Sequence, residues 1–231
     1  MPVPQVLDLW EGDEEQPGAL LLSALPGAPC TGVITESTAY EIGLNHASLH
    51  EVPIEGYGHD TAAAFIEMKN QDWRLYVSES FHSILEECRD ITGGALYAES
   101  MRHFEGLFPS LPEPDGPCLV HYDFRSGNIL VKDSKVTGIV DFESSRGGAS
   151  EVDFTKVNSW FLEGNPSLMN AYKSGYESIR KLPPLEQLLP FYTFFDALGS
   201  VNWCKKRGMR RNSALLERSM AILMECVRKG G

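Results

Sequence analysis

The sequence lacks any hydrophobic run long enough to cross a membrane. Its longest apolar segments, around Ala19–Leu22 and Phe191–Phe195, are far shorter than the roughly 20 apolar residues of a transmembrane helix. The acidic N-terminal segment, with Asp8 and Glu11–Glu15, has neither the basic nor the apolar region of a signal peptide. These absences predict a cytoplasmic protein without a membrane partner.

Positive charge and paired cysteines are also scarce. The 32 acidic residues outnumber the 20 basic ones, and the net charge of −12 argues against nucleic acid as a partner, because phosphate backbones require basic patches. The five cysteines are scattered and none belongs to a C-x-x-C pair, which indicates reduced thiols. A hydrophobic content of 42% nevertheless predicts a folded, globular chain.

Glycine motifs that cradle phosphates are missing as well. The sequence contains no G-x-G-x-x-G and no G-K-[S/T] motif, and we interpret Gly93-Gly94 as a break between helices. No lysine precedes Lys69. The first 68 residues therefore offer no lysine that could grip the phosphates of a nucleotide.

The polar motif that is present runs from His121 to Asp141. His121 and Asp123 follow a short apolar run, and Asn128 comes five residues after Asp123. A hairpin is predicted next, with Asp141 at its exit, because two β-branched runs flank a polar connection. Its strand, turn and strand are Ile129–Val131, Lys132–Lys135 and Val136–Val140. We therefore expect Asp123, Asn128 and Asp141 to face one point.

These three residue types are the ones that phosphoryl transfer needs together. One carboxylate orients the attacking hydroxyl and accepts its proton, while an amide oxygen and a second carboxylate hold Mg²⁺. A rival interpretation makes His121 and Asp123 half of a hydrolase metal site, but no further cluster with ligand spacing supports it. A polar turn in a purely structural hairpin is the other alternative.

The motif resembles that of the aminoglycoside phosphotransferase family, with choline-kinase-like enzymes nearby. In that family the motif is H-G-D-x-x-x-x-N-I-L followed by I-D-F or I-D-W. Here Tyr122 replaces the usual Gly, and Glu143 follows Asp141-Phe142. The resemblance implies an α+β, protein-kinase-like fold. It places a truncated β remnant of the N-terminal lobe at residues 1–25, and a mainly helical C-terminal lobe with the catalytic β-hairpin at 26–231.

The resemblance also implies roles for individual residues. Asp123 would be the catalytic base, and His121 and Asp153 would brace its loop. Asn128 and Asp141 would bind Mg²⁺. The nucleotide, ATP or GTP, would lie against the hinge and the hairpin, lined by Ser23, Leu25, Leu130 and Val140. The acceptor would be an aminoglycoside-like or other amino- or hydroxyl-rich small molecule.

Two alternatives follow from the missing first strands. Without a phosphate loop and a strand lysine, the chain could be a non-catalytic binding module or an incomplete fragment. The exposed strand edges of a truncated lobe would also invite pairing with another chain. Separately, His46 and His50 have the i, i+4 spacing of metal ligands, but we favour packing because no third ligand is evident.

Periodicity predicts strands at Pro4–Trp10 and at Ala19–Leu25, the second of them buried. Helices should follow, the first with a capping box at Thr38-x-x-Glu41 and the last capped by Asn212 or Ser213. The apolar positions of the middle helices repeat every three or four residues. These helices cover Trp73–Cys88, Tyr97–Phe108, Leu168–Ile179 and Leu185–Trp203.

Overall fold

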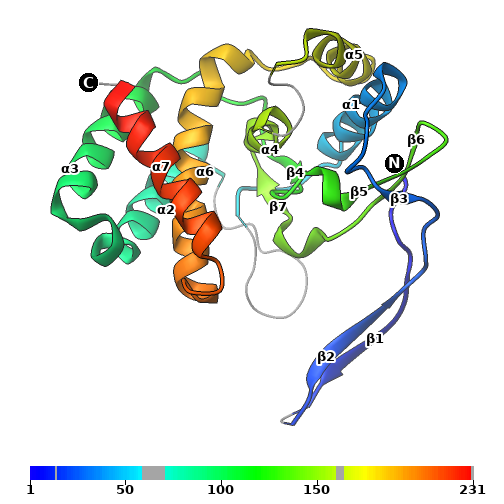
Figure 1. Ribbon diagram of the computed structural model, residues 1–231, viewed down its shortest axis with the longest axis horizontal. Helices are drawn as coiled ribbons and strands as arrows, with labels where there is room; N and C mark the ends of the chain where they lie inside the picture. The colour runs from blue at the N-terminus through cyan, green and yellow to red at the C-terminus, as the bar shows by residue number, and fades with distance from the viewer. Residues whose placement is uncertain (14, 59–70, 160–163, 230–231) are drawn as a thin grey trace. The chain divides into compact units, whose positions relative to one another are not determined.

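The computed structural model describes residues 1–13, 15–58, 71–159 and 164–229 (Figure 1). They divide into two compact units, and each draws on segments that are far apart in the sequence. The first unit contains Met1–Pro53, Leu119–Ser145 and Lys156–Leu182; the second contains Ile54–Cys118, Arg146–Thr155 and Pro183–Gly231. In the part of the chain that is described, no helix is long and apolar enough to span a membrane.

The first unit begins with an antiparallel hairpin, β1 (Val6–Gly12) and β2 (Pro17–Leu22), drawn in blue in Figure 1. The strands were predicted, but the burial of the second was wrong, because every residue of β2 is exposed. An apolar run predicts a strand; it does not specify what will cover it. Seven large apolar side chains of the hairpin are exposed: Val6, Leu7, Leu9, Trp10, Leu20, Leu21 and Leu22.

A three-stranded sheet holds the predicted catalytic hairpin. Its order is β3 (Ala28–Pro29), β5 (Ile129–Lys132) and β6 (Lys135–Ile139), with both pairs antiparallel. The turn residues Asp133 and Ser134 have φ of 50° and 61°. Two positive φ values define the turn whose twist matches a two-residue hairpin loop, so the predicted hairpin is confirmed.

Helix α1 (Glu36–His50) packs on α5 (Pro166–Glu177) in the same unit. The predicted capping box was misplaced: the cap is Thr35, whose extended backbone lets its Oγ1 accept from the Thr38 N–H at 3.1 Å. Two glycines set the close approach of these helices. A Cβ on Gly43 would meet the carbonyl oxygen of Tyr172, and one on Gly175 would meet that of Tyr40.

The second unit is mainly helical, and its core is aromatic. Phe81, Phe104 and Phe194 are buried, and the first two rings stack at 4.0 Å. Gly93, with φ of 66°, breaks the regular geometry of α3, as predicted. The helices of this unit are α2 (Trp73–Glu87), α3 (Arg89–Leu107), η1 (Phe108–Ser110), η4 (Ser150–Asp153), α6 (Leu185–Arg207) and α7 (Ser213–Lys229).

Short elements connect the segments around the predicted site. Strand β4 (Cys118–Val120) leads into the polar motif, and the turn η2 (Ser126–Asn128) connects its first part to β5. After the hairpin come η3 (Phe142–Ser144), β7 (Arg146–Gly148) and α4 (Phe154–Val157). All five cysteines are free thiols. Burial raises the pKa of the Cys88 thiol to about 11, which keeps it protonated at neutral pH.

Candidate active site

The loop from Asp123 to Asn128 is closed by its own hydrogen bonds. The Arg125 N–H donates to the Asp123 carbonyl at 2.9 Å, and the Asn128 N–H donates to the Arg125 carbonyl at 2.9 Å. The Asn128 side-chain Nδ2 returns to the Asp123 carbonyl at 3.0 Å. These three bonds fix the backbone of all three residues as one turn.

The side chains of Asp123 and Asn128 meet directly. Asn128 Nδ2 donates to Asp123 Oδ2 at 2.9 Å, and the Arg125 Nε–H donates to the same oxygen at 2.8 Å. Two bonds thus hold Asp123 Oδ2, and no described residue donates to Oδ1. Because Asn128 uses its amide nitrogen here, its amide oxygen is the end left for another ligand, and no described residue donates to it either.

Asp141 lies at the exit of the hairpin, beside Asn128. The Val140 N–H donates to the Asn128 carbonyl at 3.0 Å, which places the next residue, Asp141, at the same end of β5 and β6. Asp141 adopts the left-handed conformation, with φ of 70° and ψ of 56°. Its side chain is exposed and forms no hydrogen bond or ion pair with any residue that the structure describes. The hairpin therefore brings a free carboxylate to the mouth where Asn128 sits.

His121 ties the motif to the hairpin. It is fully buried, and its Nε2 bonds the Val140 carbonyl oxygen at 3.0 Å. Its ring lies against Phe142, with centroids 4.7 Å apart. His121 thus contacts the residues on both sides of Asp141.

Tyr122 stands where a glycine was expected, and its backbone shows why glycine suits the position. Its φ is 66°, a left-handed conformation that costs a residue with a Cβ about 1 kcal/mol or more. The chain holds this strained conformation directly before Asp123. The turn that closes through Arg125 and Asn128 fixes the backbone just after it.

Two of the residues predicted to line the nucleotide come together on the sheet. A Cβ on Gly138 would lie 2.7 Å from Leu25 Cδ1 and 3.1 Å from Leu130 Cδ1, so both leucines cover this glycine. Ser23 is instead occupied within the hairpin region: its N–H donates to the Gln5 carbonyl at 2.9 Å, and its Oγ accepts from the Gln5 N–H at 2.8 Å. These two bonds tie Ser23 to the segment that precedes β1.

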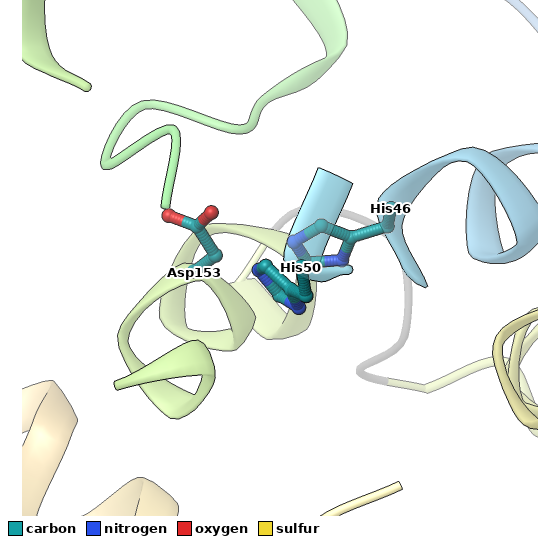
Figure 2. Close-up of side chains that lie close together, drawn as sticks. All are labelled: His46, His50 and Asp153. Carbon is teal, nitrogen blue, oxygen red and sulfur yellow. The ribbon is translucent and has the colours of Figure 1, made fainter. Parts of the chain in front are cut away.

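His46 and His50 point from α1 in the same direction (Figure 2). His46 Nδ1 bonds the Tyr172 hydroxyl at 2.6 Å, and His50 Nδ1 bonds the Tyr176 hydroxyl at 2.8 Å. His46 also stacks on Phe124 at 4.0 Å. Both histidines are buried, and each bonds through its Nδ1 to a tyrosine hydroxyl of α5. Asp153, also drawn in Figure 2, ends η4 in the second unit and is fully buried.

Sequence reasoning missed Arg125. It lies two residues after Asp123, and its guanidinium makes the ion pair with that carboxylate. A cation inside the motif was the signal in the sequence. Because the side chain is half exposed, with 51% of its surface accessible, its bond to Asp123 could not be deduced from burial or periodicity.

The comparisons with known proteins agree with the motif. The model of the phosphotransferase enzyme family matches residues 1–189. The chain therefore belongs to the phosphotransferase enzyme family. A search of the curated proteins finds no match.

Solved structures show the same protein-kinase-like fold, as predicted. Aminoglycoside phosphotransferase APH(4)-Ia, in a ternary complex with ADP and hygromycin B, is 19% identical with a TM-score of 0.72; the match covers 100% of this chain and 78% of that one. The gentamicin complex of APH(2")-IIa is 15% identical with a TM-score of 0.62, over 96% and 74%. A candidate fructosamine-3-kinase of Thermobifida fusca is 21% identical with a TM-score of 0.65, over 96% and 74%.

Proposed function

We propose that this chain transfers the γ-phosphate of ATP or GTP to a hydroxyl group of a small molecule, with Mg²⁺ as cofactor. The direct bond between Asp123 and Asn128, with Asp141 beside Asn128 at the hairpin mouth, carries the proposal. These are the carboxylate, amide and carboxylate that the reaction requires. Membership of the phosphotransferase enzyme family supports the same reaction.

Asp123 takes the part of the base. Its Oδ2 is held by Asn128 and Arg125, so Oδ1 is the oxygen that can accept the proton of an acceptor hydroxyl. The acceptor oxygen bonds to the γ-phosphorus while the bond from that phosphorus to the bridging oxygen breaks. The nucleoside diphosphate leaves with the bond's electron pair, and the proton passes to Asp123. His121 holds the strand end that carries Asp141 in place.

The residues of the hairpin mouth fit Mg²⁺. The Asn128 amide oxygen and the Asp141 carboxylate are hard oxygen ligands, and neither is used by a described residue. Asn128 and Asp141 would hold the ion, which supplies charge neutralisation to the phosphates when bound.

The nucleotide base is proposed to lie on the leucines that cover Gly138. Leu25 and Leu130 supply an apolar surface there, and Val140 continues it towards the hairpin mouth. Ser23 acts indirectly in this proposal, by fastening the hinge to the segment before β1. The division into an N-terminal lobe remnant, residues 1–25, and a helical lobe, residues 26–231, also stays a prediction.

The acceptor is proposed to be rich in amino and hydroxyl groups. Two of the neighbouring structures contain aminoglycosides, hygromycin B and gentamicin. The net charge of −12 favours a cationic acceptor over an anionic one. A screen of acceptors for nucleoside diphosphate release should begin with these two compounds.

We expect Mg²⁺-dependent binding of ATP or GTP to the chain. A ligand that binds only the folded state raises its stability by about 2.7 kcal/mol at a hundredfold excess over Kd, so the melting temperature should rise. Thermal shift and calorimetry with each nucleotide, with and without Mg²⁺, measure this. If millimolar Mg·ATP and Mg·GTP both leave the transition unchanged, the chain is a non-catalytic relative or an incomplete fragment.

The exposed β1–β2 hairpin supports a second proposal, pairing with another copy of this chain. Both strands present exposed apolar side chains, and a lone two-stranded hairpin is marginally stable in water. Sedimentation velocity should therefore show a dimer that Leu20→Lys weakens, because a charge on a strand face or edge opposes pairing. A wild-type chain that sediments as a monomer across the micromolar range would refute self-association.

A further inference from the structure

The Arg125 guanidinium has more donors than the structure uses. It carries five N–H donors. Only Nε–H is bonded, to Asp123 Oδ2 at 2.8 Å; the remaining four meet no acceptor among the described residues. The backbone of Arg125 is fixed between Asp123 and Asn128, while its side chain is 51% exposed. A rigidly mounted cation with open donors therefore lies within hydrogen-bond distance of the candidate base.

Lysine and arginine are few in the segments of the first unit that form its strands and α1. Residues 1–68 contain neither lysine nor arginine, so nothing in β1, β2, β3 or α1 offers a positive side chain. Within residues 119–145 the cations are Arg125, Lys132 and Lys135. The two lysines pair across the turn end of the hairpin, at the opposite end from Asn128. In this segment, Arg125 alone stands at the hairpin mouth.

A terminal phosphate arriving there would meet two carboxylates, Asp123 and Asp141. The like charges oppose its approach, and a divalent ion offsets only part of the charge of a nucleoside triphosphate. A guanidinium is suited to offset the remaining negative charge, because it stays ionised and its planar donor groups match two phosphate oxygens. An exposed ion pair such as Arg125–Asp123 contributes little to stability, so holding the fold together is a poor account of it.

We infer that Arg125 binds the terminal phosphate of the nucleotide. The inference rests on the proposed function. In this role Nε–H keeps its bond to Asp123, while the open donors take phosphate oxygens. During transfer these donors stabilise the negative charge spread over the equatorial oxygens. Arg125 is thus a catalytic residue for the same reaction, and it exchanges no proton.

The test compares two nucleotides that differ in the terminal phosphate. Calorimetry of the full chain with Mg·AMP-PNP and Mg·ADP gives a ratio of two dissociation constants, and only a terminal-phosphate contact changes that ratio. Arg125→Gln should raise the dissociation constant of Mg·AMP-PNP by about tenfold, which corresponds to the loss of one charge-assisted hydrogen bond. The dissociation constant of Mg·ADP should stay within about twofold of wild type. Arg125→Lys should restore part of the loss. Lys135→Gln, which removes one charge from the same hairpin, should leave both dissociation constants unchanged.

A double variant separates direct contact from an effect through Asp123. If Arg125 only screens that carboxylate, its removal should change nothing in an Asp123→Asn background; a direct contact keeps its roughly tenfold effect there. Loss of that effect, or an equal loss for Mg·ADP and Mg·AMP-PNP, overturns the inference about Arg125 while nucleotide binding stands. A wild-type chain that binds neither nucleotide overturns the proposed function and this inference together.

Discussion

Asp123→Asn should lower phosphoryl transfer by about 10²–10⁴-fold, the contribution typical of a positioned general base. The structure indicates that this substitution can keep the hydrogen bonds of the loop. The asparagine oxygen can still accept from Asn128 Nδ2 and the Arg125 Nε–H, the two bonds that now hold Asp123 Oδ2. The amide nitrogen then takes the place of Oδ1 and presents a donor to the acceptor hydroxyl, where an acceptor is needed.

The measurement is the rate of nucleoside diphosphate release with the acceptor found in the screen. Asp133→Asn is the matched control, because it makes the same chemical change in the turn of the same hairpin. Asp133 is exposed with φ of 50°, a conformation that asparagine tolerates, so transfer and stability should stay at wild-type values. Full turnover by a folded Asp123→Asn chain would show that another group receives the proton.

The β5–β6 hairpin could be predicted because local signals define it. Spacing fixed where Asn128 and Asp141 would lie, and two positive φ residues close a turn whose polar sequence is visible in the chain. His121 was identified as a candidate from the same local motif. Structure that is determined by residues close together in the sequence can be predicted from the sequence.

Contacts that depend on distant segments could not be recovered. His46 and Tyr172 are 126 residues apart, as are His50 and Tyr176, and no periodicity in the sequence predicts either pair. The exposure of β2 depends on what covers it, which a run of leucines leaves open. The cap of α1 was misplaced because Thr35 and Thr38 both offer a hydroxyl three residues before a helical N–H.

The helix pair α1–α5 gives the largest expected change in stability. Gly43→Ala should lower the free energy of unfolding by about 3 kcal/mol, the upper part of the range for overpacking. The new Cβ meets a backbone carbonyl oxygen, that of Tyr172, which cannot move aside as the end of a flexible side chain can. Relief requires the two helices to separate, and separation loosens the buried bonds from His46 and His50 to α5.

Urea unfolding measures the change, with Gly32→Ala as the control. Gly32 lies in the same unit, and apart from its chain neighbours no described residue comes within 4 Å of its would-be Cβ, so the control should stay within about 0.5 kcal/mol of wild type. Gly175→Ala should cost as much as Gly43→Ala, because its Cβ meets the Tyr40 carbonyl oxygen. The two changes together should cost less than their sum, since helices already forced apart by one Cβ leave room for the second. Strict additivity would mean that each glycine acts through its own backbone freedom and that the close helix approach does not set the stability of this unit.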